Sequence, residues 1–187
     1  MKKMILVSSV FTAVFIIWCV IRIANAVSFD LECKAYLQRA AAANTVELAK
    51  PELAKAIEYA EQNNLTSGIV SIFLKNPTND IGFWYGNMKA SYEELDKIAD
   101  DATALEKTNV LMKLRETLTD RDSSGGTKIT VPEGIAIYPN NVVYFWLCIF
   151  TVAGICVFGT WLLVIAGKKG YLEGKIKVNT VEFNKKQ

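Results

Sequence analysis

The stretches MILVSSVFTAVFIIWCVIRI, residues 4–23, and VVYFWLCIFTVAGICVFGTWLLVIA, residues 142–166, decide the fold of this chain. Each is long enough to cross a bilayer as a helix, which needs about 20 predominantly apolar residues. The charged residues between the two stretches make the middle of the chain too polar to enter lipid. The sequence therefore predicts a small domain held at a membrane by one helix before it and one after it.

The two stretches divide the chain of 187 residues into five expected parts. The fold class is expected to be all-α, with two transmembrane helices flanking an antiparallel bundle of about four helices, because four short helices return the chain to the side from which it left. The expected bounds are 1–26 for the N-terminal anchor, 27–121 for the extracytoplasmic bundle, 122–141 for an irregular connector, 142–167 for the second transmembrane helix and 168–187 for a basic cytoplasmic tail. Small residues in the second of these helices, such as Gly154 and Gly159, permit close contact with another helix.

The distribution of charge predicts the orientation of the chain. The ends, 1–26 and 142–187, carry nine basic and two acidic residues, whereas the middle carries twelve basic and seventeen acidic residues. Lys and Arg close to a membrane-spanning helix favour the cytoplasmic side. We therefore expect both termini in the cytoplasm and the acidic domain outside, where it is a poor partner for nucleic acid. Arg22 is the exception, and we expect its long side chain to reach the headgroups.

The triplet Ala24-Asn25-Ala26 leaves a second interpretation of the first helix open. It follows a basic start and an apolar run, which is the pattern of a signal-peptidase site, here before Val27. The apolar run is longer than the roughly 7–15 residues of a signal peptide. Arg22 also places a charge just before the triplet. An uncleaved anchor is therefore favoured over a cleaved signal peptide.

Apolar residues at helical spacing predict the first helices of the middle segment. The first helix is expected to continue out of the membrane to Asn44-Thr45, because no Gly or Pro occurs before Pro51. Pro51 is expected in the first turn of the next helix. The run from Ile69 to Leu74 fits either a short buried helix or an extended connector, and the segment from Ile129 to Tyr138 is expected to lie along the bundle.

A longer helical stripe follows the turn at 76–80, where a polar side chain can cap a helix. Its members are Trp84, Met88, Leu95, Ile98, Ala102 and Leu105. A second stripe, 111–118, is displaced from the first, and Asp100-Asp101 can cap a new helix near the change. Whether Asp80 to Leu118 is one helix or two stays open at this point, with two favoured.

The adjacent aromatic residues Phe83, Trp84 and Tyr85 are the candidate partner-binding site. Three consecutive side chains point around most of a helical turn, so they cannot all face one core. Trp84 is expected to be buried, because the apolar stripe continues from it. Phe83 and Tyr85 are then expected to contact a protein partner or lipid headgroups. Tyr138, Tyr144 and Trp146, together with Arg22, are expected at the membrane interface, where aromatic side chains gather.

The composition offers little for catalysis. His is absent, which removes the commonest general base and the commonest metal ligand. The four Cys residues form no C-x-x-C pair, and the acidic residues at 93–101 alternate with Lys in the manner of a solvated helix face. We therefore expect no catalytic residue, no metal ion and no cofactor.

Several short stretches resemble segments of an uncharacterised family of small bacterial inner-membrane proteins with an extracytoplasmic helical domain. They are Leu37-Gln38-Arg39-Ala40 through Asn44-Thr45-Val46-Glu47, Leu65-Thr66-Ser67-Gly68, Gly82-Phe83-Trp84-Tyr85 and Leu114-Arg115-Glu116-Thr117-Leu118. The resemblance implies a bacterial inner (cytoplasmic) membrane and no known activity.

Two classes of function fit these features. The first is a scaffold or accessory subunit that binds a membrane or periplasmic protein, or a second copy of itself, through its helical domain. The second is the ligand-sensing input module of a receptor, which would need a separate signalling partner because the tail after the second helix is short. The absence of a recognisable nucleophile and base disfavours an enzyme.

Overall fold

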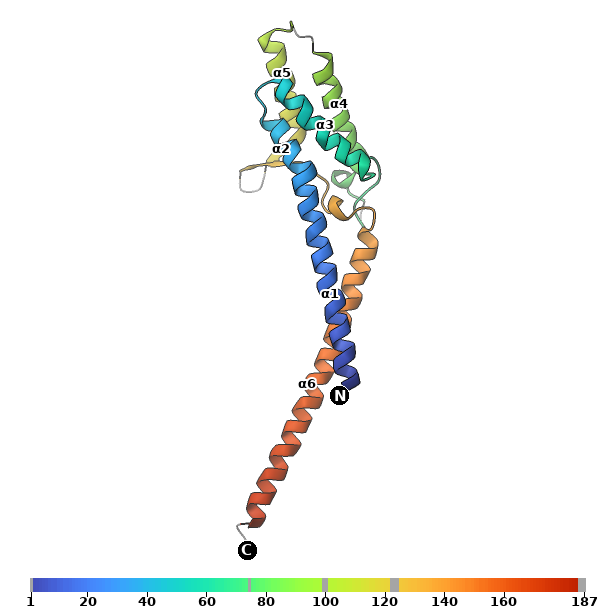
Figure 1. Ribbon diagram of the computed structural model, residues 1–187, viewed down its shortest axis with the longest axis vertical. Helices are drawn as coiled ribbons and strands as arrows, with labels where there is room; N and C mark the ends of the chain where they lie inside the picture. The colour runs from blue at the N-terminus through green and yellow to red at the C-terminus, as the bar shows by residue number, and fades with distance from the viewer. Residues whose placement is uncertain (1, 74, 99–100, 122–124, 185–187) are drawn as a thin grey trace. The chain divides into compact units, whose positions relative to one another are not determined.

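The computed structural model describes residues 2–73, 75–98, 101–121 and 125–184, and within these ranges it describes side chains from residue 3 to residue 168. The chain forms two compact units. One unit contains residues 1–21 and 143–187, and the other contains residues 22–142. As predicted, the chain is mostly helical (Figure 1).

The first unit is built from the start of α1 (Lys2–Phe29) and most of α6 (Asn141–Asn184). The helical segments Lys3–Ala42 and Asn141–Lys168 are long and apolar enough to cross a membrane. Their apolar side chains are exposed around the helix, and Leu163 is 74% exposed. A helix that is apolar on all sides needs an apolar medium or another protein to cover it.

A hydrogen bond and a ring stack join α1 and α6 within this unit. The Trp18 Nε1–H donates to the backbone carbonyl of Tyr144 at 3.0 Å. The ring of Phe11 stacks on Phe158 and lies so close to Gly154 that a Cβ there would be 2.5 Å from the ring. The prediction that small residues allow close helix contact is therefore confirmed at Gly154, whereas Gly159 has open space around it.

The second unit begins with an unbroken helical path. α1 passes into a π-helical turn, η1 (Asp30–Lys34), and then into α2 (Ala35–Ala42), so the helix ends just before Asn44-Thr45, as predicted. Phe29, Cys33 and Leu37 are all buried. An α-helix has 3.6 residues per turn, so a four-residue spacing drifts by about 40° per step. The wider π-helical turn opposes this drift and keeps the three side chains on one face.

The helix α3 (Val46–Gln62) starts earlier than predicted. The Thr45 hydroxyl accepts a hydrogen bond from the Leu48 N–H at 3.3 Å and caps the helix. Pro51 therefore lies inside α3 and not in its first turn, so that prediction is wrong. The helix ends at Asn63-Asn64, where Asn64 adopts a positive φ of 56°.

An extended connector, not a helix, links α3 to the next helices. Ile69 forms an isolated antiparallel bridge with Asp80, and Val70 is buried while Phe73 is 70% exposed. Leu74 lies outside the described residues. After the 3-10 turn η2 (Pro77–Asn79), the Asp80 carboxylate accepts from the Phe83 N–H at 3.0 Å and caps α4 (Ile81–Lys97).

The prediction of two helices between Asp80 and Leu118 is confirmed by the start of α5 (Ala104–Leu118). The cap is Thr103: its hydroxyl accepts from the Glu106 N–H at 3.3 Å, and the Glu106 carboxylate accepts from the Thr103 N–H at 2.8 Å. The predicted cap at Asp100-Asp101 is therefore wrong for Asp101, which lies in a turn, and Asp100 lies outside the described residues. Ala102 and Leu105 do not extend the α4 stripe, because α4 has already ended.

Two short strands follow α5 and add a small sheet to the predicted all-α fold. β1 (Thr119–Arg121) and β2 (Thr127–Ile129) pair antiparallel, with Thr119 opposite Ile129. The 3-10 turn η3 (Ile135–Ile137) comes next and buries two isoleucines. Residues 122–141, expected to be irregular, thus contain β2 and η3. The segment after β2 lies along the helices, as predicted, because Ile129 and Ile135 are part of the core.

The core of the second unit lies between its helices. α3 packs against η1, α2 and α4, while α5 packs against α2 and α4 (Figure 1). The largest completely buried side chains come from η1, α2, α3 and α4, and they are Cys33, Leu37, Leu53, Ile81, Met88 and Leu95.

Candidate functional site

The three adjacent aromatic residues at the start of α4 have three different environments. Trp84 is only 7% exposed, and its Nε1–H donates to the backbone carbonyl of Thr130 at 3.1 Å. This confirms the predicted burial, since Met88 and Leu95 continue the buried face. Phe83, one position earlier, is 68% exposed. The helix phase therefore presents one large apolar ring to the outside of the unit.

Tyr85 is half-buried and already has a partner inside the unit. Its hydroxyl donates to Glu61 Oε1 of α3 at 2.5 Å, and the Lys89 ammonium lies 3.7 Å from the same oxygen. Burial, together with the hydrogen bond to Glu61, raises the pKa of Tyr85. The phenol therefore stays protonated as a donor and ties α4 to α3. Phe83 is the member of the predicted site that is most open to a partner.

Phe83 lies on the edge of an apolar groove with a volume of about 270 Å³. The walls come from three separated parts of the chain: η2 and α4, the end of α5, and the segment after β2. Its apolar lining residues are Pro77, Phe83, Trp84, Met88, Leu118 and Pro132. Pockets for small molecules occupy about 300–1,000 Å³. This groove is smaller, and it has room for a single bulky side chain.

The walls of this groove outside η2 and α4 could not be assigned from the sequence. Leu118 and Pro132 lie far from Phe83 in the chain, and no pattern in the sequence links them to it. The stripe at 111–118 predicts that Leu118 lies on a helix, and the weak alternation after Ile129 predicts a segment along the bundle. The hydrogen bond from Trp84 to Thr130 joins that segment to α4.

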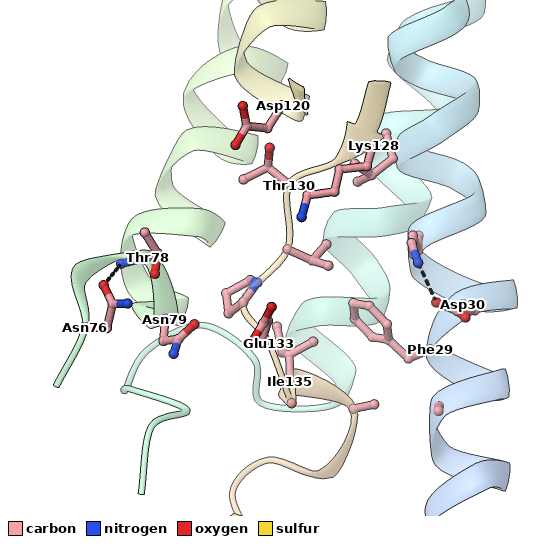
Figure 2. A pocket seen from close by; sticks show the side chains of 17 residues that line it. Phe29, Asp30, Asn76, Thr78, Asn79, Asp120, Lys128, Thr130, Glu133 and Ile135 are labelled. Carbon is pink, nitrogen blue, oxygen red and sulfur yellow. Dashed lines mark hydrogen bonds and ion pairs between the residues drawn. The ribbon is translucent and has the colours of Figure 1, made fainter. Parts of the chain in front are cut away.

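A second cleft, of about 580 Å³, lies where the segment after β2 crosses between α1–η1 and η2. Figure 2 shows Phe29 and Ile135 at its apolar side, with Lys128 reaching into it from β2. Its polar lining has mixed charge. Asp30 pairs with the Lys34 ammonium at 3.2 Å, and Glu133 adds a further carboxylate. The volume is within the range of small-molecule pockets.

The residues predicted for the membrane interface are divided between the two units. Tyr144 and Trp146 belong to α6 in the first unit, where Trp146 is 47% exposed. Arg22 is exposed at the start of the second unit. Tyr138 is partly buried against the core of the second unit, and its hydroxyl lies directly over Gly68. The packing of Tyr138 thus has a structural role within the domain.

The one thiol in the domain is poorly suited to nucleophilic chemistry. Cys33 is completely buried, and its Sγ lies 3.9 Å from the backbone carbonyl of Ala56. Burial raises the pKa of this thiol to about 12, so the reactive thiolate is scarce at neutral pH. Among the described residues, no group of three or more His, Cys, Asp or Glu side chains could hold a metal ion.

Comparison with protein families, with curated proteins and with solved structures finds no match to this chain.

Proposed function

We propose that this protein is a non-enzymatic scaffold or accessory subunit, anchored in a membrane, that binds a membrane or periplasmic protein through its helical domain. The observation that supports this function best is Phe83, which is 68% exposed at the edge of an apolar groove. An exposed aromatic ring beside a pocket is typical of the anchor residues that dominate binding energy at protein interfaces. A second copy of the chain is the simplest alternative partner.

The membrane part of the proposal has two supports. Both α1 and α6 are apolar enough to span a bilayer, and their apolar side chains are exposed. The basic ends of the chain favour cytoplasmic termini and an extracytoplasmic domain. We further propose that α2, α3, α4 and α5 act as an antiparallel four-helix bundle outside a bacterial inner membrane, with residues 1–26 retained as an anchor.

Cysteine labelling in intact cells tests this orientation. In a cysteine-free background, a cysteine at the exposed Leu105 should react with a maleimide that cannot cross the membrane. One at Lys168, after the second apolar stretch, should react only when the cells are opened. Labelling of both positions, or of the Lys168 position alone in intact cells, would contradict the topology.

Photo-crosslinking at Phe83 tests the scaffold function. We expect p-benzoylphenylalanine at position 83 to give one adduct of defined mass, which is a dimer if the partner is a second copy. The same substitution at Leu105 provides a control, because Leu105 is 70% exposed on α5 but does not line the groove. Phe83→Ala should abolish recovery of the partner and change stability by less than about 0.5 kcal/mol, as usual for an exposed side chain.

Two outcomes would refute this proposal. One is equal crosslinking from positions 83 and 105, which would mean that contacts are not specific to the groove. The other is unfolding of the domain by Phe83→Ala, because that ring would then belong to the core and not to a binding surface.

A ligand-sensing input module is a second candidate. The mixed cleft beside Phe29 and Ile135 favours it, since its volume of about 580 Å³ is sufficient for a small molecule. A sensor of this kind would transmit its signal through a separate protein. A small molecule that raises the melting temperature of wild type but not of Glu133→Gln would favour the sensing function. If a broad screen of metabolites finds no such molecule, the result would oppose the sensing function.

A further inference from the structure

A third cleft, of about 490 Å³, lies between α2, α5 and β2 and is distinct from the Phe83 groove. Its charged lining residues are Lys34, Arg115 and Lys128, which come from η1, α5 and β2 respectively. Its other polar lining residues are neutral, and Ala41, Ala42 and Ile129 give it an apolar side. The described lining contains no carboxylate.

The positive charge of this cleft differs from the charge of the rest of the domain. The middle of the chain carries seventeen acidic and twelve basic residues, so a cleft whose charged lining residues are all basic departs from the average. Part of the charge is compensated, because Lys34 pairs with Asp30 at 3.2 Å. Asp120 stands opposite Lys128 in the hairpin and lines the neighbouring cleft, but the two side chains form no ion pair. Lys34 and Lys128 line both clefts.

The guanidinium group of Arg115 is held in a fixed orientation by a backbone carbonyl. Its Nε–H donates to the backbone carbonyl of Ala41 at 3.0 Å, which fixes the plane of the guanidinium group. Its two terminal nitrogens form no hydrogen bond or ion pair with the described residues. A guanidinium group held in this way offers two parallel N–H donors, the arrangement that recognises phosphate.

We propose that this cleft binds the phosphate group of an organic molecule, with Arg115 as the bidentate donor and Lys128 and Lys34 supplying further charge. A dianionic phosphate matches this set of cations better than a single carboxylate does. The volume exceeds that of a phosphate alone, and the apolar side can cover the organic part of the ligand. A soluble phosphate monoester and the headgroup of phosphatidic acid, which is also a phosphate monoester, share this chemistry.

Thermal unfolding of the full chain tests the proposal. In detergent without anionic lipid, inorganic phosphate should raise the melting temperature in a saturable way relative to chloride at equal ionic strength. Half-saturation should require at least about tenfold more phosphate in Arg115→Gln, because a charge-assisted pair of hydrogen bonds is lost. Lys97→Gln removes a positive charge from α4, which does not line this cleft, and should leave the response unchanged.

A second arm distinguishes the two sources of phosphate. The chain is placed, in phosphate-free buffer, in nanodiscs of phosphatidylcholine with or without phosphatidic acid. Stabilisation by inorganic phosphate supports a soluble ligand, whereas stabilisation by phosphatidic acid alone supports a lipid headgroup, provided that Arg115→Gln removes either effect. No stabilisation in either arm, or equal stabilisation of wild type and Arg115→Gln, overturns the proposal.

Arg115→Gln also removes the hydrogen bond to Ala41, so this variant could fail for structural reasons. Lys128→Gln avoids this difficulty, because Lys128 is exposed on the hairpin. We expect it to fold normally and to weaken phosphate binding. An unchanged phosphate response in a folded Lys128→Gln chain would overturn the assignment of Lys128.

Discussion

Replacing Trp84 by Ala is expected to lower the free energy of unfolding of the domain by about 3–5 kcal/mol, the usual cost of truncating a buried aromatic ring. Trp84 is 7% exposed, and its ring packs into the core between α4 and the segment after β2. The variant also loses the hydrogen bond from Nε1–H to the Thr130 carbonyl. Chemical denaturation, followed by far-ultraviolet circular dichroism, measures the change.

Two further variants separate the contributions to this effect. Trp84→Phe keeps most of the apolar ring but lacks the donor, so it should cost less than Trp84→Ala, with about 0.5–1.5 kcal/mol from the lost hydrogen bond. Phe83→Ala, at the neighbouring exposed position, should have little effect on stability. If Trp84→Ala has no effect while Phe83→Ala unfolds the domain, the helix phase and the candidate site are both wrong.

Gly68→Ala is expected to destabilise the domain by about 2–6 kcal/mol, the sum of a backbone cost and a packing cost. Gly68 has a φ of 108°, a region that side chains other than that of glycine adopt at a cost of about 1–3 kcal/mol. A Cβ at this position would also lie 2.0 Å from the Tyr138 hydroxyl oxygen, so the half-buried tyrosine must move. Displacing a packed side chain adds a cost of about 1–3 kcal/mol. The melting temperature of the purified chain reports the sum.

Gly86→Ala provides the matched control for this substitution. Gly86 lies inside α4, and a Cβ added there would have no atom of another element within 4 Å. The added methyl group should therefore stabilise the helix by up to about 1 kcal/mol. Combining Gly68→Ala with Tyr138→Phe should recover part of the loss, because the nearest atom is the hydroxyl oxygen. If Gly68→Ala is as stable as wild type, the close packing of the Tyr138 hydroxyl on Gly68 does not contribute to the stability of the domain.

Local patterns in the sequence were sufficient for much of the helical structure. The end of the first long helix before Asn44-Thr45, a helix cap within the turn at 76–80 and the buried phase of Trp84 all follow from residues within one or two turns. Helix caps and apolar stripes act over that distance, so they can be recognised without knowledge of the fold. The break before α5 was also predicted, although Thr103, and not the aspartate pair, caps the new helix.

The sequence by itself thus determined the two apolar stretches, the helical class of the domain and which ring of the aromatic triplet is buried. Only the tertiary structure decided what surrounds Phe83 and Arg115. The groove needs Leu118 and Pro132 beside α4, and the basic cleft needs Lys34, Arg115 and Lys128 together. These residues are distant in the chain and meet because α5 packs on α2 and α4, and because β2 turns back along β1. Periodicity and capping report only interactions between near neighbours, whereas clefts form between elements whose contacts depend on packing of the whole core.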